Sequence, residues 1–252
     1  MKMEQTDQEE KNNLRGAGRN KQEIKENLQE ARGNLHEGKV VFRTIIARTT
    51  LRGKADMSVI TATYNERDNV PLLIEELNGI FREKGIKGEV VVVDDNSPDG
   101  TSDVVLEMQK KYPFTVLIKR PGKMGIGSAY REGVDNSWGD VVSLMDADFS
   151  QPPAILPQLY DIALQDKIGW GSRYVENVKF ESDVPHIIGT KVLNTWISAW
   201  LRTGIRDHTL GYFALKRETL NLILNHATEK NIAPFDSVLY GLPIAAIALK
   251  LG

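Results

Sequence analysis

The stretch VVSLMDAD, residues 141–148, decides the fold because it joins an apolar run directly to a pair of carboxylates. The run suits a buried strand, and Asp146 and Asp148 follow it with one alanine between them. Two like charges at the end of a buried strand are unfavourable unless a cation or a cationic ligand stabilises them. We therefore expect a strand that carries two acidic ligands to one edge of a sheet.

Three further apolar runs upstream repeat this arrangement of a strand followed by polar residues. They are residues 59–64, which end in Asn65-Glu66, residues 90–93, which end in Asp94-Asp95, and residues 115–118, which lead to a basic turn. Helices are predicted to begin near Asn69, Thr101 and the glycine-flanked residues 125–128. Strands that alternate with helices predict an α/β fold, Rossmann-like, with a mostly parallel sheet flanked by helices. Ligands bind at the carboxyl ends of the strands in such sheets, where these acidic residues gather.

The composition fits one large α/β domain and excludes several kinds of site. The 252 residues are 41% hydrophobic, which is enough for a sizeable core. The chain has no cysteine, which excludes disulfides, thiolate zinc sites and a cysteine nucleophile. The longest late apolar stretch, residues 239–249, is interrupted by glycine and proline and is shorter than the roughly 20 residues that a membrane-spanning helix needs. The charged amino terminus is not that of a secretory signal.

Residues 1–56 are expected to form a charged, disordered amino-terminal extension, and residues 57–252 the folded domain. The extension carries 12 Lys and Arg against 9 Asp and Glu, and its first forty residues include few large apolar ones. A basic arm that contacts anionic lipid or nucleic acid is the functional alternative. Charges of both signs without an aromatic cluster do not favour it, and we expect no nucleic-acid partner.

The two carboxylates of residues 146–148 are predicted to converge on one hard cation. Taken alone, a D-x-D pattern is more often a solvated turn than a ligand pair. Here the acidic ends of two other predicted strands, at Glu66 and Asp95, favour a pocket for a nucleotide diphosphate. The phosphates and water would complete the coordination of the cation.

Five motifs carry a resemblance to a known family. They are ATYNE (62–66), VDDNSPDGT (93–101), MDADFS (145–150), GSRY (171–174) and DHTLGYFALKRE (207–218). Their order and spacing resemble the inverting nucleotide-sugar glycosyltransferases of family 2, most of all the branch that transfers mannose to dolichol or polyprenyl phosphate. The resemblance runs from about Met57 to the end of the chain. It implies a GT-A fold, a single nucleotide-binding sheet domain with an acceptor-side extension.

The resemblance also implies a role for each matching residue. Asp146 and Asp148 would hold Mg²⁺ or Mn²⁺ at the diphosphate, and these two with Arg173 would be the catalytic residues. Tyr64 could instead be an ordinary core aromatic, and Arg173 a surface arginine paired with a nearby glutamate. The residues implied to bind the nucleotide-sugar are Ala62, Tyr64, Glu66, Val93, Asp95, Asp146, Ala147, Asp148 and Arg173.

The implied reaction moves mannose, or another hexose, from GDP-mannose or a related nucleotide-sugar to a polyprenyl phosphate at the cytoplasmic membrane face. A phosphate acceptor is already ionised at neutral pH, so no strong base is required. The four histidines are accordingly expected to be surface or helix residues rather than catalysts; they are His36, His186, His208 and His226. The resemblance also implies a peripheral membrane location and, as in some relatives, a small membrane subunit as a partner.

Residues 185–203 repeat apolar side chains at helical spacing and include Trp196 and Trp200. One interpretation is a helix that packs in the core. The other, which the resemblance favours, is a helix at the membrane surface that guides the lipid, where tryptophan is commonly found. Lys191, Arg202 and Arg206 would then contact the lipid phosphate.

The sequence departs from the family pattern at several positions. Ala62 replaces the usual proline, and Ser150 stands where some relatives have a glutamine metal ligand. A basic segment is expected beyond Asp236 to close over the diphosphate, whereas the sequence ends at Gly252, so the domain is expected to be truncated at its carboxyl end. This leaves two alternatives to the transferase: a catalytically impaired nucleotide-sugar-binding protein, or another family 2 enzyme with a saccharide acceptor.

Overall fold

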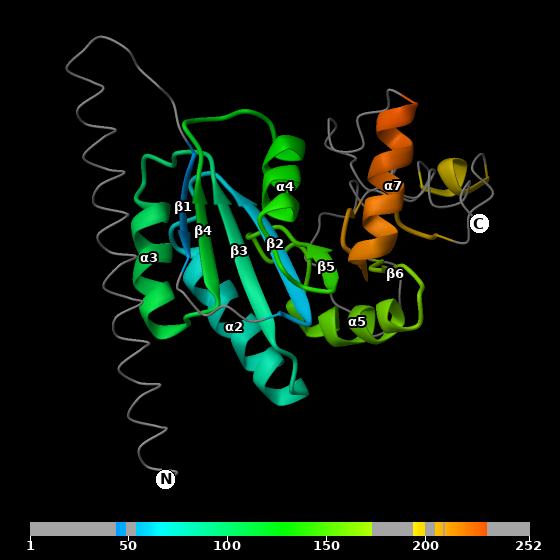
Figure 1. Ribbon diagram of the computed structural model, residues 1–252, viewed down its shortest axis with the longest axis horizontal. Helices are drawn as coiled ribbons and strands as arrows, with labels where there is room; N and C mark the ends of the chain where they lie inside the picture. Colours follow the sequence, from blue (N-terminus) through cyan, green and yellow to red (C-terminus); the bar gives the residue numbers. More distant parts are fainter. Residues whose placement is uncertain (1–43, 49–53, 173–193, 200–204, 209, 231–252) are drawn as a thin grey trace.

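The computed structural model describes residues 44–48, 54–172, 194–199, 205–208 and 210–230 (Figure 1). Within these residues, seven strands form one sheet in the order β1-β4-β3-β2-β5-β7-β6. The strands are β1 (Ile45–Arg48), β2 (Met57–Thr63), β3 (Gly88–Asp94), β4 (Thr115–Lys119), β5 (Val141–Leu144), β6 (Gly169–Trp170) and β7 (Phe213–Lys216). The helices are α2 (Asn69–Lys84), α3 (Thr101–Lys111), α4 (Ile126–Asp135), α5 (Leu156–Leu164), which follows a short 3-10 turn at Pro153–Ile155, and α7 (Arg217–Glu229).

The centre of the sheet is parallel and its flanks are antiparallel. β4, β3, β2 and β5 pair in parallel, each joined to the next along the chain by a helix. β1 pairs antiparallel with β4, and β7 pairs antiparallel with both β5 and β6. Five of the seven strands therefore run in one direction, which confirms the predicted α/β fold with a mostly parallel sheet.

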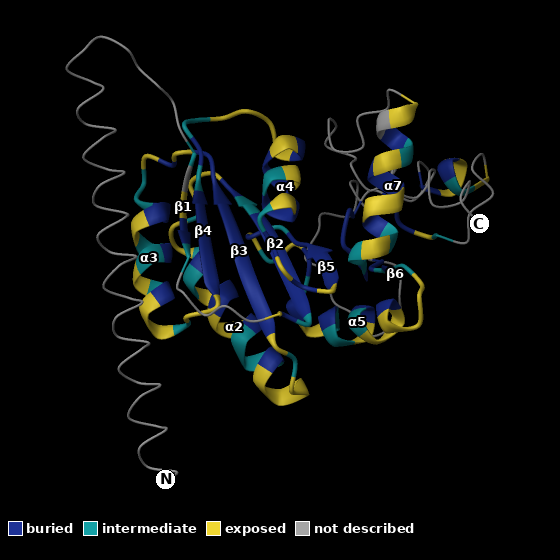
Figure 2. Ribbon diagram, viewed as in Figure 1, coloured by how far each residue is buried: buried dark blue, intermediate teal, exposed yellow. Residues whose placement is uncertain are grey.

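Two apolar clusters cover the two faces of the sheet. β3 contributes to both, because Val90 and Val92 point to one face while Val91 and Val93 point to the other. Helices α2, α3 and α5 pack on the first face, and α4 and α7 pack on the second. Figure 2 shows the central strands buried between these helices, as the continuous β-branched run predicts.

The predicted start of the folded part needs correction, because β1 comes from the stretch that was expected to be a disordered extension. Its residues pair with β4 from Ile45↔Lys119 to Arg48↔Val116. The buried Gln109 side chain of α3 donates hydrogen bonds to the carbonyls of Ala47 (3.0 Å) and Thr115 (2.8 Å), and so joins β1 to β4. The expectation for residues 1–43 lies outside the described residues and stays a prediction.

Arg48, the last residue of β1, joins this edge strand to the middle of the sheet. It forms an ion pair with the buried carboxylate of Glu89, with 3.1 Å between Nη1 and Oε2. Its guanidinium also lies 3.6 Å from the centre of the Trp138 ring.

In the part of the chain that the structure describes, no helix has the length and apolar character required to cross a bilayer.

Candidate functional site

The carboxyl ends of β2, β3 and β5 lie side by side and form an acidic edge, defined here as Glu66, Asp95, Asp146 and Asp148. Parallel pairing of β2 with β3 and of β2 with β5 puts these ends at one edge of the sheet. Backbone bonds continue beyond the strands, from Asp95 N–H to the Thr63 carbonyl (3.1 Å) and from Met145 N–H to the Ile60 carbonyl (3.0 Å). The sheet thus brings together the acidic residues that the sequence predicted to meet.

The backbone turns sharply just after each of these three strands. Asn65, Asn96 and Phe149 have φ values of 62°, 56° and 61°, in the left-handed region. Asparagine tolerates this conformation, whereas it is uncommon for an aromatic residue such as Phe149. Strained backbone often accompanies functional sites, so the left-handed conformation of Phe149, directly after Asp148, supports a site in the turn after β5.

Asp146 is held at both carboxylate oxygens by neutral donors. The Tyr130 hydroxyl donates to Oδ1 at 2.7 Å, and the Gln151 amide donates to Oδ2 at 3.0 Å. Burial raises the pKa of the Asp146 carboxyl, and the negative charges of Asp148 and Glu66 raise it further, against the opposite effect of the Tyr130 hydrogen bond. The ionised form of Asp146 is therefore unfavourable in the absence of a ligand, and a bound cation would stabilise it.

Asp148 differs from Asp146 in being exposed to solvent. Its Oδ1 accepts a hydrogen bond from the Ser150 backbone N–H at 2.9 Å. Between the two carboxylates, Ala147 is buried in the core beneath. β5 ends at Leu144, so Asp146 and Asp148 lie in the turn after the strand rather than on one face of it.

The two aspartates at the end of β3 have different surroundings. Asp94 is fully buried and accepts hydrogen bonds from the hydroxyls of Ser97 and Ser102, so it stabilises the turn into α3. Asp95 forms an ion pair with Arg120, whose side chain is fully buried, with 2.5 Å between Nη2 and Oδ1. Val93 is buried in the core, so only its backbone can face a ligand at this edge.

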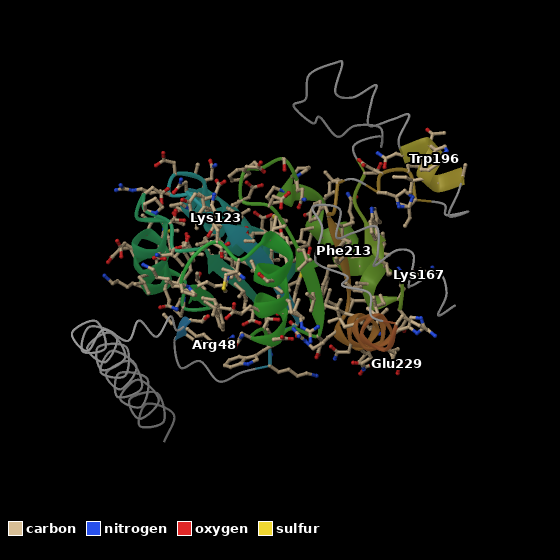
Figure 3. All side chains as sticks on the ribbon, turned by 90° about the horizontal axis from the view of Figure 1, so that it is seen from above. Arg48, Lys123, Lys167, Trp196, Phe213 and Glu229 are labelled. Carbon is tan, nitrogen blue, oxygen red and sulfur yellow. The ribbon has the colours of Figure 1, made fainter. Side chains whose placement is uncertain are left out.

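Tyr64 and Lys123 meet at the same edge. Tyr64 is 38% exposed and is therefore not a core aromatic. The ammonium of Lys123 lies 3.5 Å from the centre of the Tyr64 ring, which makes a cation–π contact. Lys123 is labelled in Figure 3. The Glu66 carboxylate, two residues after Tyr64, accepts a hydrogen bond from the Asn69 side-chain amide at 2.8 Å. An aromatic face and a carboxylate are thus available for a ligand with both ring and hydroxyl groups.

Some predicted site residues are not brought to the acidic edge by the described structure. Ala62 lies within β2 and packs partly against the core. Arg173, and with it Lys191, Arg202 and most of the predicted helix at 185–203, lies outside the described residues. Of that helix, residues 194–199 are described as helical, with Ile197 buried and Trp196 65% exposed. Figure 3 shows Trp196 far from Lys123 along the long axis.

The prediction for His208 is wrong, because this histidine is buried rather than on the surface. It is 1% exposed and stands edge-on to Trp170, with 6.4 Å between the ring centres. Its backbone N–H donates to Asn194 Oδ1 at 2.7 Å, and Nε2 lies 3.2 Å from Ser198 Oγ. Burial lowers its pKa, with a smaller opposing effect from Asp207. His226 lies on α7 as a helix residue, as expected.

The donor set fits a cation that is shared with a bound ligand. Among the described residues, no group of three or more His, Asp or Glu side chains is placed to hold a metal ion. Two carboxylates at the end of β5 are nevertheless sufficient for Mg²⁺ or Mn²⁺ when phosphate oxygens and water supply the remaining ligands. Asp148 is exposed for such a contact, and Asp146 is held in a defined orientation beside it.

Three side chains that organise this edge were not predicted from the sequence: Tyr130, Gln151 and Arg120. Tyr130 and Arg120 reach their carboxylates from 16 and 25 residues away, so no local pattern indicates the contacts. Gln151 lies five residues after Asp146, and an amide side chain so close in sequence to a carboxylate pair is the signal that could have identified it.

The fold and the acidic edge define a Rossmann-like α/β protein with a ligand site at its strand ends. A family model for glycosyl transferase family 2 matches residues 58–224, and the chain belongs to this family. Family membership and the mostly parallel sheet together confirm the predicted GT-A type of fold.

Two curated relatives resemble the chain. A dolichol-phosphate mannosyltransferase from Pyrococcus furiosus is 36% identical over 168 residues, which cover 65% of this chain and 47% of the relative. A polyprenol monophosphomannose synthase from Mycolicibacterium smegmatis is 35% identical over 182 residues, which cover 69% of this chain and 66% of the relative. The chain thus spans about half the length of the first relative and about two thirds of the second.

Solved structures also resemble the chain, at lower identity. Glucosyl-3-phosphoglycerate synthase from Mycobacterium tuberculosis, in complex with Mn²⁺, UDP-glucose and phosphoglyceric acid, is 18% identical with a TM-score of 0.48. The match covers 66% of this chain and 58% of that one. A likeness at this level adds nothing to the family match.

Proposed function

We propose that this chain transfers mannose, or another hexose, from GDP-mannose or a related nucleotide-sugar to dolichyl or polyprenyl phosphate, with inversion at the sugar carbon. The observation that carries the proposal is the position of Asp148, exposed at the end of β5 beside Asp146 and the acidic ends of β2 and β3. Membership of glycosyl transferase family 2 and the names of the two curated relatives support the reaction and the acceptor.

Each residue of the edge has a proposed task that its surroundings support. Tyr64 offers an exposed ring face to the base, and Glu66 and Asp95 offer acceptors to the base and ribose. The backbones of Ala62 and Val93 line the same groups. Ala147 and Asp146 would lie along the ribose and diphosphate, and Arg173 would meet a phosphate of the donor or the acceptor.

Mg²⁺ or Mn²⁺ would be held by Asp146, Asp148 and diphosphate oxygens. When bound, the cation stabilises the charge that develops on the leaving nucleoside diphosphate, without a proton donor. The acceptor phosphate is ionised at neutral pH, so its oxygen can attack without a strong base. The protein then has to orient two anionic groups, the diphosphate and the acceptor phosphate, around one cation. The carboxylates held at the acidic edge can fix the position of that cation.

We further propose that the chain acts at the cytoplasmic membrane face as a peripheral protein, with a small membrane subunit as a candidate partner. A polyprenyl acceptor resides in a bilayer, so the site has to approach its surface. The exposed ring of Trp196 beside the buried Ile197 supports a helix with one face available to an interface. Arg206, which lies close to this helix in sequence, would contribute a positive charge.

The test is a titration of the full chain with GDP-mannose and, separately, UDP-glucose, each with and without Mn²⁺, followed by a transfer assay. We expect Mn²⁺-dependent binding of GDP-mannose and movement of labelled mannose to a polyprenyl phosphate extract. Binding without transfer would support an impaired nucleotide-sugar-binding protein instead. Transfer to a saccharide but not to the lipid would support a different family 2 enzyme.

A further inference from the structure

Two carboxylates of the acidic edge are stabilised in opposite ways. Asp95 forms an ion pair with the buried guanidinium of Arg120, so its charge is compensated within the protein. Among the described residues, Asp146 accepts hydrogen bonds from the Tyr130 hydroxyl and the Gln151 amide, which are both neutral, so these partners do not compensate its charge. A compensated carboxylate suits neutral donors of a base or a sugar, whereas an uncompensated one suits a cation.

We propose that Tyr130 and Gln151 are positioning residues that fix the Asp146 carboxylate for the cation and the diphosphate. The inference rests on the proposed function and adds two residues to it. Each carboxylate oxygen has one of its lone pairs occupied by a donor at 2.7 Å or 3.0 Å. The plane of the carboxylate is therefore set before a ligand arrives, and the remaining lone pairs face a defined direction.

Tyr130 is held in place by the core. It lies on α4, is fully buried, and belongs to the apolar cluster on the second face of the sheet. α4 approaches the sheet closely at Gly133, where an added Cβ would lie 2.3 Å from Ile60 Cγ2. Because the helix and the ring cannot shift freely, the phenol oxygen is a rigid donor to Asp146.

Gln151 is held by three hydrogen bonds and is also fully buried. Its Oε1 accepts from the Asp146 backbone N–H at 3.1 Å, and its Nε2 donates to Asp146 Oδ2 and to the Leu210 carbonyl at 2.8 Å. A rotation of the amide by 180° would place Oε1 against two acceptors, so only one orientation satisfies all three partners. Gln151 thereby joins Asp146 to the segment that precedes β7.

The experiment compares Tyr130→Phe and Gln151→Met with matched variants elsewhere in the chain. Tyr160→Phe on α5 removes a hydroxyl from a residue whose ionisable neighbours, Asp56, Asp161 and Asp140, lie outside the acidic edge. Gln109→Met on α3 removes a buried amide that likewise donates to two oxygens, the carbonyls of Ala47 and Thr115. Each pair thus shares the chemical change and differs in proximity to Asp146.

Two binding equilibria are measured. Electron paramagnetic resonance measures Mn²⁺ binding in the presence of GDP, and calorimetry measures GDP binding with and without Mn²⁺. Tyr130→Phe and Gln151→Met are expected to weaken Mn²⁺ binding about 10-fold, as for the loss of a hydrogen bond to a charged group. GDP binding without metal is expected to change less than about twofold, because the proposed contacts of the base and ribose with Tyr64, Glu66 and Asp95 remain. Tyr160→Phe and Gln109→Met are expected to leave Mn²⁺ binding unchanged, even where Gln109→Met lowers stability as much as Gln151→Met.

Two results would overturn the inference, and they can be told apart. Wild-type protein that binds Mn²⁺ with GDP, together with folded Tyr130→Phe protein of equal Mn²⁺ affinity, overturns the positioning role alone. Wild-type protein that shows no Mn²⁺-dependent GDP binding overturns the proposed function, and the inference with it. Tyr130→Phe keeps the ring and its packing, so it remains decisive if Gln151→Met does not fold.

Discussion

The guanidinium of Arg120 and the carboxylate of Asp95 lie 2.5 Å apart, and the arginine is fully buried. Arg120 also donates to Ser128 Oγ at 2.6 Å and to the Gly125 carbonyl at 3.1 Å, at the start of α4. One cation therefore joins the ends of β3 and β4 to the helix that carries Tyr130. The acidic edge depends on this arginine for its shape as well as its charge.

Arg120→Met is expected to lower the free energy of unfolding by about 3–5 kcal/mol, because it leaves the Asp95 charge without its buried partner. Chemical denaturation would measure the loss. The control is Arg131→Met, which removes an exposed pair with Asp135 at 3.0 Å and is expected to cost about 0.5 kcal/mol. Equal losses in the two variants would contradict a special role for the buried pair.

Asp148→Asn is expected to abolish Mn²⁺-dependent nucleotide binding and to change the free energy of unfolding by less than about 0.5 kcal/mol. The exposed carboxylate is a proposed metal ligand, and among the described residues its side chain accepts a hydrogen bond from the nearby Ser150 N–H, which an asparagine oxygen can also accept. Calorimetric titration with GDP and Mn²⁺ provides the measurement. Asp161→Asn, on the exposed surface of α5, serves as the control and should bind as the wild type does. Retained metal-dependent affinity in Asp148→Asn would refute the metal assignment.

Gly133→Ala and Gly79→Ala are expected to have opposite effects, although both replace a helical glycine. At Gly133 the new Cβ would meet Ile60 Cγ2 at 2.3 Å, and the overpacking is expected to cost about 1–3 kcal/mol. Over most of this range the cost exceeds the gain in helix propensity, which is about 1 kcal/mol. At Gly79 on α2 no atom lies within 4 Å, so only the gain remains. Thermal unfolding of both variants would test this; a stabilised Gly133→Ala protein would show that α4 can move away from β2.

The stability of the protein is expected to decrease as the pH falls from about 7 toward 5, partly because of His208. Burial lowers the folded-state pKa of this histidine, while in the unfolded chain it is near 6.5. Between these two pKa values the unfolded chain binds a proton that the folded protein does not, so acid favours unfolding. Denaturation of His208→Gln at several pH values should show a shallower dependence. An unchanged slope would contradict a contribution of His208 to the pH dependence.

The parallel centre of the sheet could be predicted because its signals are local. β2, β3 and β5 each combine an apolar run with polar residues at the end, and each is followed by a turn and a helix. The flanks could not be predicted in the same way. β1 is only four residues long, and its pairing with β4 is fixed by contacts such as Gln109 to Ala47, 62 residues apart.

The sequence predicts the acidic residues of the candidate site. It does not predict the side chains that hydrogen-bond to these residues and hold them in place. Glu66, Asp95, Asp146 and Asp148 stand out as charges at strand ends. Tyr130, by contrast, resembles any apolar-face residue of a helix, and its hydroxyl meets Asp146 only after α4 has packed on the sheet. His208 was misjudged for a related reason, because its burial depends on contacts with Asn194 and Trp170 that are distant in sequence.

The short strand β1 has a consequence for how the protein behaves at high concentration. It covers the outer edge of β4, whose residues from Thr115 to Ile118 are buried. A protein trimmed to begin at Met57 would retain every residue of the acidic edge, yet it would present the backbone donors and acceptors of β4 to other molecules. Uncovered apolar edge strands are sites of intermolecular pairing. Such a trimmed protein should therefore aggregate, whereas one that begins before Ile45 should remain monodisperse.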